Sequence, residues 1–118
     1  MSRPLGEWGE DRAVEYLKER NWTILHRNYR TAFGECDLIA QKEGITAFVE
    51  VKTRNSRDFG PPESAIDREK RRHLKRIVRH YLSEEANPGQ PRFDVIAILF
   101  DPDHPEIRHI PGAFQVNP

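Results

Sequence analysis

The segment Phe93–Phe100 constrains the fold most, because it is an almost continuous apolar run interrupted only by Asp94. Side chains alternate between the two faces of a strand, so a strand that is apolar on both faces must be covered on both. The segment before it predicts an amphipathic helix that can cover one face of this strand. Its apolar residues recur at the spacing of one helix face: Leu74, Ile77, Val78, Tyr81 and Leu82. We expect this helix to begin after Asp67 and to stop at Asn87-Pro88-Gly89.

The upstream half of the chain predicts a further helix and three strands. Leu5–Arg20 favours the helix, and the strands are expected at Trp22–Tyr29, Glu35–Gln41 and Thr46–Thr53, the last two joined by a tight turn at Glu43-Gly44. This order predicts an α/β domain with a mixed central sheet flanked by helices. An antiparallel meander is followed, after a crossover helix, by a parallel strand.

We expect residues 1–118 to form a single domain, with a core over about residues 5–100. The Pro-rich segment 101–118 can add a short edge strand at Glu106–Ile110. Nineteen Lys and Arg balance nineteen Asp and Glu, which argues against a polycation that binds nucleic acid by bulk charge alone. No apolar run approaches the roughly 20 residues of a membrane span. A single cysteine and the lack of a signal-peptide core favour a cytoplasmic location without a membrane partner.

The predicted hairpin places acids side by side. With Glu43-Gly44 as the turn, Asp37 lies opposite Glu50 and Glu35 opposite Lys52, all on one face. The other face is apolar and carries Cys36, Leu38 and Ala40 against Val51, Val49 and Ala47. Two opposed carboxylates repel by up to about 1 kcal/mol on an exposed sheet. A divalent cation removes this conflict, because carboxylates and a strand carbonyl are the hard oxygen ligands that Mg²⁺ prefers.

Glu10 lies in the middle of the apolar stripe of the first helix, where a carboxylate needs a partner. If this helix packs on the acid-bearing face of the hairpin, Glu10 points at the acid pair. Each feature alone is more typical of a structural role, since exposed ion pairs contribute little and Glu-x-Lys alternation usually marks a solvated face. Their convergence favours a metal site. Zinc is not favoured, because the candidate ligands lack the close paired spacing of a structural site: Cys36, His26, His73, His80, His104 and His109.

At these residues the chain resembles the PD-(D/E)XK nuclease superfamily, in which an Asp on one strand precedes Glu-x-Lys on the next. More closely, it resembles the YraN-like family of uncharacterised bacterial proteins, which is similar to archaeal Holliday-junction resolvases. Cys36, where that family usually has Ile, is the one departure we note, and it lies outside the proposed chemistry. Ordered blocks over most of the chain match: Gly9-Glu10 with Ala13, Asn28-Tyr29-Arg30, Gly34 to Ile39, Phe48 to Arg54, Lys70, and Arg92 to Val95.

The resemblance implies a restriction-endonuclease-like three-layer fold and metal-dependent phosphodiester hydrolysis of nucleic acid, with branched DNA as a candidate substrate. It assigns Mg²⁺ or Mn²⁺ to Asp37, Glu50 and the Val51 carbonyl, with Glu10 bound directly, through water or at a second metal. It implies that Lys52 orients the attacking water or stabilises charge, and that Glu35 supports the site. By analogy with resolvases that act on two-fold substrates, it also implies a homodimer.

Cations for substrate contact concentrate on the second helix, where only Asp67 and Glu69 oppose them. A phosphate-binding surface and a merely solvated helix face both fit this pattern. Lys70 lies one turn before Leu74 and could reach toward the acids. The candidates are Arg30, Arg54, Arg68, Lys70, Arg71, Arg72, Lys75, Arg76 and Arg79. Two alternatives stay open: a non-catalytic nucleic-acid-binding or accessory module that keeps the nuclease fold, and a nuclease directed at RNA.

Overall fold

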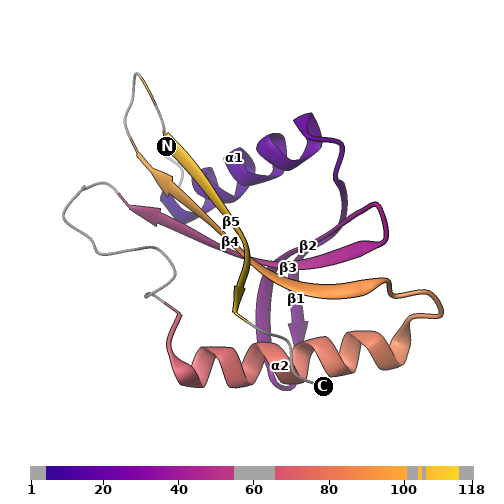
Figure 1. Cartoon of the computed structure of the whole chain (residues 1–118). Coiled ribbons are helices and arrows are strands. Elements are labelled where there is room, and N and C mark those ends of the chain that lie inside the picture. Colours follow the sequence, from indigo (N-terminus) through magenta and orange to yellow (C-terminus); the bar gives the residue numbers. More distant parts are fainter. Residues whose placement is uncertain (1–4, 55–65, 101–103, 105, 115–118) are drawn as a thin grey trace.

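The structure is a computed structural model that describes residues 5–54, 66–100, 104 and 106–114. Two helices and five strands follow one another along the chain (Figure 1). They are α1 (Leu5–Glu19), β1 (Thr23–Thr31), β2 (Gly34–Lys42), β3 (Ile45–Arg54), α2 (Arg68–Glu84), β4 (Gln90–Leu99) and β5 (Glu106–Phe114). The predicted elements are confirmed in type and order. None of the described helices is long and apolar enough to cross a membrane.

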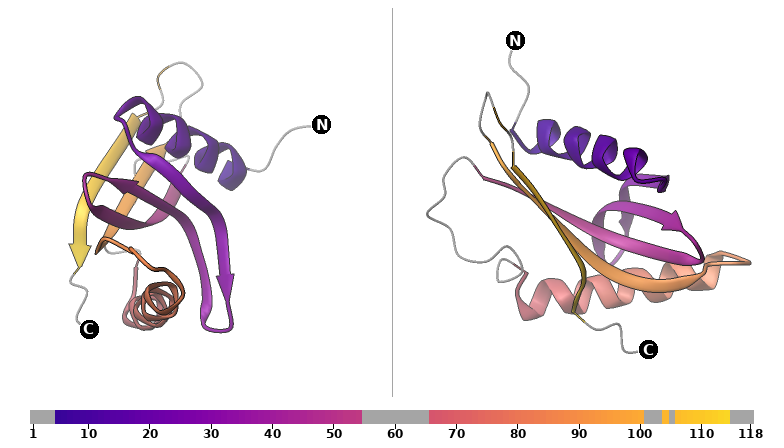
Figure 2. Two further views of the ribbon diagram at one scale, coloured as in Figure 1. Left: turned by 90° about the vertical axis from the view of Figure 1, so that its right-hand side faces the viewer. Right: turned by 45° about the horizontal axis from the view of Figure 1, so that its top comes forward.

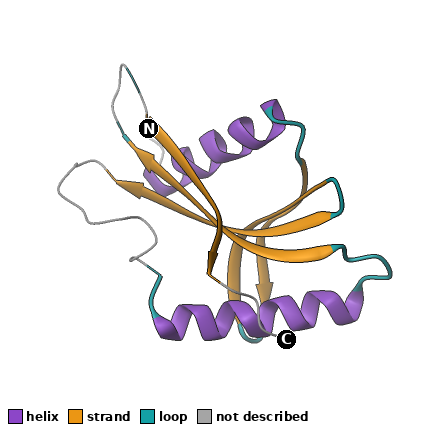
Figure 3. Cartoon of the chain, viewed as in Figure 1, coloured by secondary structure: helices purple, strands orange, loops and turns teal. Residues whose placement is uncertain are grey.

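The five strands form one mixed sheet in the order β1-β2-β3-β4-β5. Among the described strands, only the β3–β4 pair is parallel, because α2 crosses over between these two strands. The two helices lie on opposite faces of the sheet, α1 on one side and α2 on the other (Figures 2 and 3). This is the predicted three-layer, restriction-endonuclease-like arrangement.

The β2–β3 hairpin has the predicted register near its turn. Its pairs run from Lys42–Ile45 to Leu38–Val49. Glu43 and Gly44 both have positive φ, 50° and 80°, as the mirror-image turn of a two-residue hairpin requires.

The hairpin pairing ends at Leu38 and Val49. The predicted direct pairs of Asp37 with Glu50 and of Glu35 with Lys52 are therefore wrong. Beyond this point β2 remains paired with β1, and β3 remains paired with β4, so the two strands separate.

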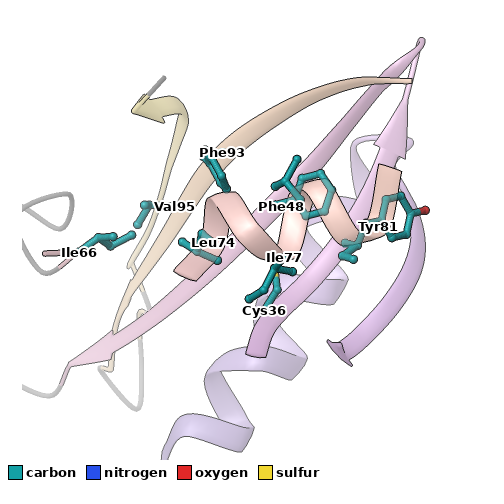
Figure 4. Close-up of a cluster of buried hydrophobic side chains, with 10 residues drawn as sticks. Cys36, Phe48, Ile66, Leu74, Ile77, Tyr81, Phe93 and Val95 are labelled. Atoms are coloured by element: carbon teal, nitrogen blue, oxygen red, sulfur yellow. The ribbon is translucent and has the colours of Figure 1, made fainter. Parts of the chain in front are cut away.

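Two apolar layers hold the helices to the sheet. Figure 4 shows the layer under α2, where Leu74 and Ile77 pack against Phe48 and Phe93 of the sheet. The layer under α1 joins that helix to the opposite face of the sheet through Ala13, Val14, Leu17, Leu38, Ala40, Ala47, Val49, Ile96 and Ile98. The helix α1 therefore does not pack on the hairpin face bearing Ile39, Phe48 and the acids, which was the condition for Glu10 to point at the acid pair. The small Ala40 and Ala47 leave room for a helix on the other face.

The strand β5 is longer than predicted, because a buried acid of β4 anchors it. Asp94 is 1% exposed and accepts hydrogen bonds from Arg92 Nε at 2.8 Å and from Gly112 N at 3.1 Å, and its Oδ2 lies 2.8 Å from His109 Nε2. Burial alone would raise the pKa of Asp94, but the hydrogen bonds from His109, Arg92 and Gly112 lower it below its usual value. The side chain that interrupts the apolar run thus fixes the edge of the sheet.

We predict that Asp94→Ala lowers the free energy of unfolding by about 3 kcal/mol, because it leaves Arg92 and the Gly112 amide without their buried partner. Urea denaturation measures this change. Arg108→Ala, which removes an exposed ion pair with Glu106 within β5, serves as the control and should cost less than about 1 kcal/mol. Equal losses for both variants would show that Asp94 is not an anchor.

Candidate active site between two separating strands

The alternation of side chains along β2 is broken at Asp37. Cys36 and Ile39 are buried on the α2 side, whereas Leu38 between them is buried on the α1 side. A regular strand would place Cys36 on the face of Leu38, so that prediction was wrong about the face, although Cys36 is fully buried. The break lies across from Asn28 of β1, which adopts a left-handed φ of 53°.

The break leaves the carboxylate of Asp37 directed at β3. The Val51 amide donates a hydrogen bond to Asp37 Oδ2 at 2.8 Å. This bond replaces the backbone ladder, which has ended at Leu38 and Val49. Because β3 stays paired with β4 as far as Arg54, the position of the Val51 amide is fixed from the other side. Asp37 therefore joins the two strands where they separate.

Glu50 precedes Val51 and is 6% exposed. Its Oε1 lies 3.6 Å from Lys52 Nζ and 3.5 Å from Lys70 Nζ. Lys70 Nζ also donates a hydrogen bond to the backbone oxygen of Glu35 at 3.2 Å. The other oxygen, Oε2, is buried and has no hydrogen-bond partner among the described residues. One carboxylate thus pairs with lysines from two elements and keeps one oxygen for a further ligand.

Glu10 approaches these acids from α1. At the preceding position, a Cβ on Gly9 would collide with Thr53 Oγ1, so glycine is what lets α1 lie this close to β3. Glu10 Oε1 is 3.8 Å from Arg27 Nη2, and it is buried without a hydrogen-bond partner among the residues described. Although α1 covers the face opposite to the one expected, Glu10 comes near the acids because β2 and β3 are no longer paired here.

All three carboxyl groups have raised pKa values. Burial, followed by the charge of Asp37, raises the pKa of Glu50 to about 7 against the lowering effect of the two lysines. Burial also raises the pKa of Asp37, although the Val51 amide and the lysines lower it. The pKa of Glu10 is raised by burial first and by Asp37 second. Negative charge at this point is poorly solvated and insufficiently balanced, which is the condition that a bound cation relieves.

The donor atoms of the site fit a hard divalent cation. Carboxylate oxygens from Asp37 and Glu50 are ligands that Mg²⁺ and Mn²⁺ take, and Glu50 Oε2 lacks any other described partner. No three His, Cys, Asp or Glu side chains of the described residues converge to hold an ion jointly. Glu10 is therefore not a third direct ligand in this arrangement of the described residues. Two carboxylates with water in the remaining positions match the usual coordination of Mg²⁺.

Four arginines of α2 form one exposed line along the helix, which we call the arginine stripe: Arg68, Arg72, Arg76 and Arg79. Their spacing of four, four and three residues places them on one face. Leu74, Ile77 and Val78 of the same helix are buried against the sheet. The four arginines lie on the opposite side of the helix and therefore face the solvent. This part of the predicted cationic surface is confirmed as exposed.

The remaining predicted cations have other surroundings. Arg71 is half-buried with its guanidinium 5.0 Å from the Phe114 ring, and Lys75 is half-buried. The exposed Arg30 pairs with Glu35 at 3.1 Å. Arg54 Nη1 donates to the Thr53 carbonyl at the end of β3. Lys70 belongs to the acid site, as its position one turn before Leu74 allowed, so it is not simply a surface cation.

Sequence reasoning missed two residues that shape the site. Asn28 adopts the left-handed conformation across from Asp37, and Arg27 pairs with Asp11 at 2.8 Å beside Glu10. Asn tolerates positive φ better than most residues, but its presence in a strand-like segment does not by itself indicate a break. No signal in the sequence identifies Arg27.

The model of the uncharacterised protein family UPF0102 matches residues 9–98. A UPF0102 protein of Syntrophotalea carbinolica is 45% identical over 114 residues, which are 96% of this chain and 93% of the relative. One from Syntrophomonas wolfei is 42% identical over 117 residues, 97% of this chain and 100% of the relative. One from Caldicellulosiruptor saccharolyticus is 46% identical over 100 residues, 84% of this chain and 85% of the relative.

The family model covers every block on which the resemblance to an uncharacterised bacterial family rested, from Gly9 to Val95. That resemblance is confirmed. The chain belongs to the uncharacterised protein family UPF0102.

Proposed function

We propose that the protein is a metal-dependent endonuclease that hydrolyses phosphodiester bonds of nucleic acid. The observation that supports this most is Glu50, a buried acid with two lysines on one oxygen and no described partner on the other. Stability alone does not favour such a group, because an incompletely paired buried carboxylate is costly. The raised pKa values of Glu50 and Asp37 support a site that is completed by a cation.

In this proposal, Asp37, Glu50 and the Val51 carbonyl hold Mg²⁺ or Mn²⁺. When bound, the ion polarises the phosphate and lowers the pKa of a water molecule. Lys52, held beside Glu50, stabilises the negative charge that develops on the phosphate and orients the attacking water. Glu10 acts through water or at a second metal position. Glu35 is a positioning residue, since its carboxylate pairs with Arg30 and its backbone oxygen accepts a hydrogen bond from Lys70.

We propose that the substrate is DNA and that it binds through the arginine stripe. We also propose that the protein is located in the cytoplasm, where DNA is available to it. Guanidinium groups bind phosphates in a planar, two-pronged geometry, and four exposed arginines in line can follow a backbone. The homodimer remains a proposal by analogy with enzymes that act on two-fold substrates. The alternative, a non-catalytic nucleic-acid-binding module, is favoured only by the stripe, whose exposure does not depend on the acids.

Metal binding is the first test. We predict that Mg²⁺ and Mn²⁺ raise the melting temperature of the wild type, because they bind the folded site and neutralise it. Asp37→Asn should abolish the shift without unfolding the protein, since the amide oxygen of Asn still accepts from the Val51 amide. Glu19→Gln, a change at a highly exposed acid, should keep it. If neither ion changes the melting temperature of the wild type, the proposed metal site is contradicted.

The second test measures the stability of the metal-free protein as a function of pH. Because the pKa of Glu50 in the folded state, about 7, lies above its ordinary 4.5, the folded protein binds the extra proton between these values. Glu50 therefore contributes most to the free energy of unfolding at low pH. This contribution should fall by about 3 kcal/mol as pH rises from about 4.5 to 7. Urea denaturation across this range should show a smaller fall for Glu50→Gln. The same fall in both proteins would mean that another group causes it.

Catalysis is the third test. We predict that the wild type with Mg²⁺ or Mn²⁺ cleaves some member of a panel of linear, flapped and four-way DNA and single-stranded RNA. Lys52→Met should lower the cleavage rate at least about 100-fold, because it removes a cation from the developing charge, while the metal-induced melting shift persists. Equal cleavage by both proteins would contradict the role of Lys52. A wild type that binds the panel but never cleaves it would favour the non-catalytic module.

A further inference from the structure

Phe33 occupies the tip of the turn between β1 and β2, and the residue is 42% exposed. The turn around it is held in place. Thr31 Oγ1 accepts a hydrogen bond from the Phe33 amide at 3.0 Å and donates one to the Gly34 carbonyl at 3.2 Å. Gly34, with φ of 130°, packs on α2, where a Cβ would lie 3.7 Å from Ile77 and 3.8 Å from His73. The fold thus fixes an aromatic ring at the surface beside α2.

The ring lies next to the arginine stripe. The guanidinium of Arg76 is 6.0 Å from the centre of the Phe33 ring, at the outer limit of a cation–π contact. The stripe from Arg68 to Arg79 is about 16 Å long, which matches about five phosphates of one B-form strand. Lys70 of the acid site precedes Arg76 by about 9 Å along the helix axis.

Phe33 also lies close to the acids along the chain. It precedes Asp37 by four residues, a distance of at most about 14 Å in extended backbone. A group bound on the ring is therefore within a few nucleotides of the proposed cleavage position.

Three large apolar side chains are exposed among the described residues: Leu25, Phe33 and Phe100. Phe100 packs edge-to-face against Trp8 at 5.0 Å. Phe33 instead has the guanidinium of Arg76 6.0 Å from the centre of its ring. A single exposed ring beside arginines is the combination that binds single-stranded nucleic acid, in which bases stack on the ring and cations hold the backbone.

We propose that Phe33 stacks on an unpaired base of a DNA strand whose phosphates lie on the arginine stripe. A base inside a duplex is already stacked on both sides and is not available to the ring without being unpaired. The site therefore prefers DNA with unpaired bases, such as a flap, over a continuous duplex. This inference rests on the proposed nuclease function and narrows its substrate class.

The test is equilibrium binding of fluorescently labelled DNA, measured by anisotropy in EDTA so that no cleavage occurs. The probes are a single strand, a flapped duplex and a blunt duplex. Phe33→Ala should weaken binding of the single strand and the flap by about tenfold or more, the value of one base–aromatic stack, and leave the blunt duplex within about twofold. Phe33→Trp should restore the binding, and the flap should quench the additional indole fluorescence of this variant.

Two control variants distinguish the loss of base stacking on Phe33 from the loss of an apolar side chain in general and from the loss of a positive charge. Leu25→Ala removes an apolar side chain of similar exposure from the same hairpin and should leave binding unchanged. Arg76→Met should lower the slope of log affinity against log salt by about 0.7 on the single strand, whereas Phe33→Ala should not change that slope. The urea midpoint of each variant establishes that it is folded.

The outcomes distinguish this inference from the function on which it rests. If Phe33→Ala binds all three probes like the wild type, or weakens all three equally, the stacking role is overturned while the nuclease proposal stands. If the wild type binds none of the probes, in EDTA or with Ca²⁺, both are overturned. Equal losses for Leu25→Ala and Phe33→Ala would also overturn the stacking role.

Discussion

The hydrogen bond from the Val51 amide to Asp37 is the interaction on which the arrangement of the site depends. It lies where β2 leaves β3, and it replaces the backbone pairing that the two strands have lost. Around this point, Lys70 of α2 pairs with Glu50, and the charge of Asp37 raises the pKa of Glu10 on α1. A regular hairpin would have continued the ladder and kept the two faces apart.

The formal neutrality of the chain conceals two opposite concentrations of charge. Acids with raised pKa values meet at the strand divergence, and four exposed arginines line α2. Lys52 and Lys70 both pair with Glu50. Such a division suits a site that holds a cation and a polyanion together, since the charge of each region attracts a different partner.

The fold could be predicted from the sequence because its signals are periodic. The apolar run at Phe93–Phe100, the helical spacing after Asp67 and the turn at Glu43-Gly44 each specify an element locally. Glu50, Lys52 and Lys70 lie together as the sequence suggested, whereas the predicted pairing of the acids across the hairpin is wrong. The failures share a cause, because alternation breaks at Asp37, and a break of this kind comes from the tertiary separation of strands rather than from any local residue pattern. The anchor of β5 on Asp94 was missed for a similar reason, since its partners His109 and Gly112 are distant in sequence.

The central claim is that Asp37 and Glu50 form a divalent-cation site. The most direct test is an NMR titration of the side-chain carboxyl carbons, with and without Mg²⁺, assigned through Asp37→Asn and Glu50→Gln. We expect that, without the ion, Glu50 titrates near pH 7, and that Mg²⁺ moves its midpoint down by at least one pH unit. A midpoint near 4.5 that Mg²⁺ does not move would contradict the claim.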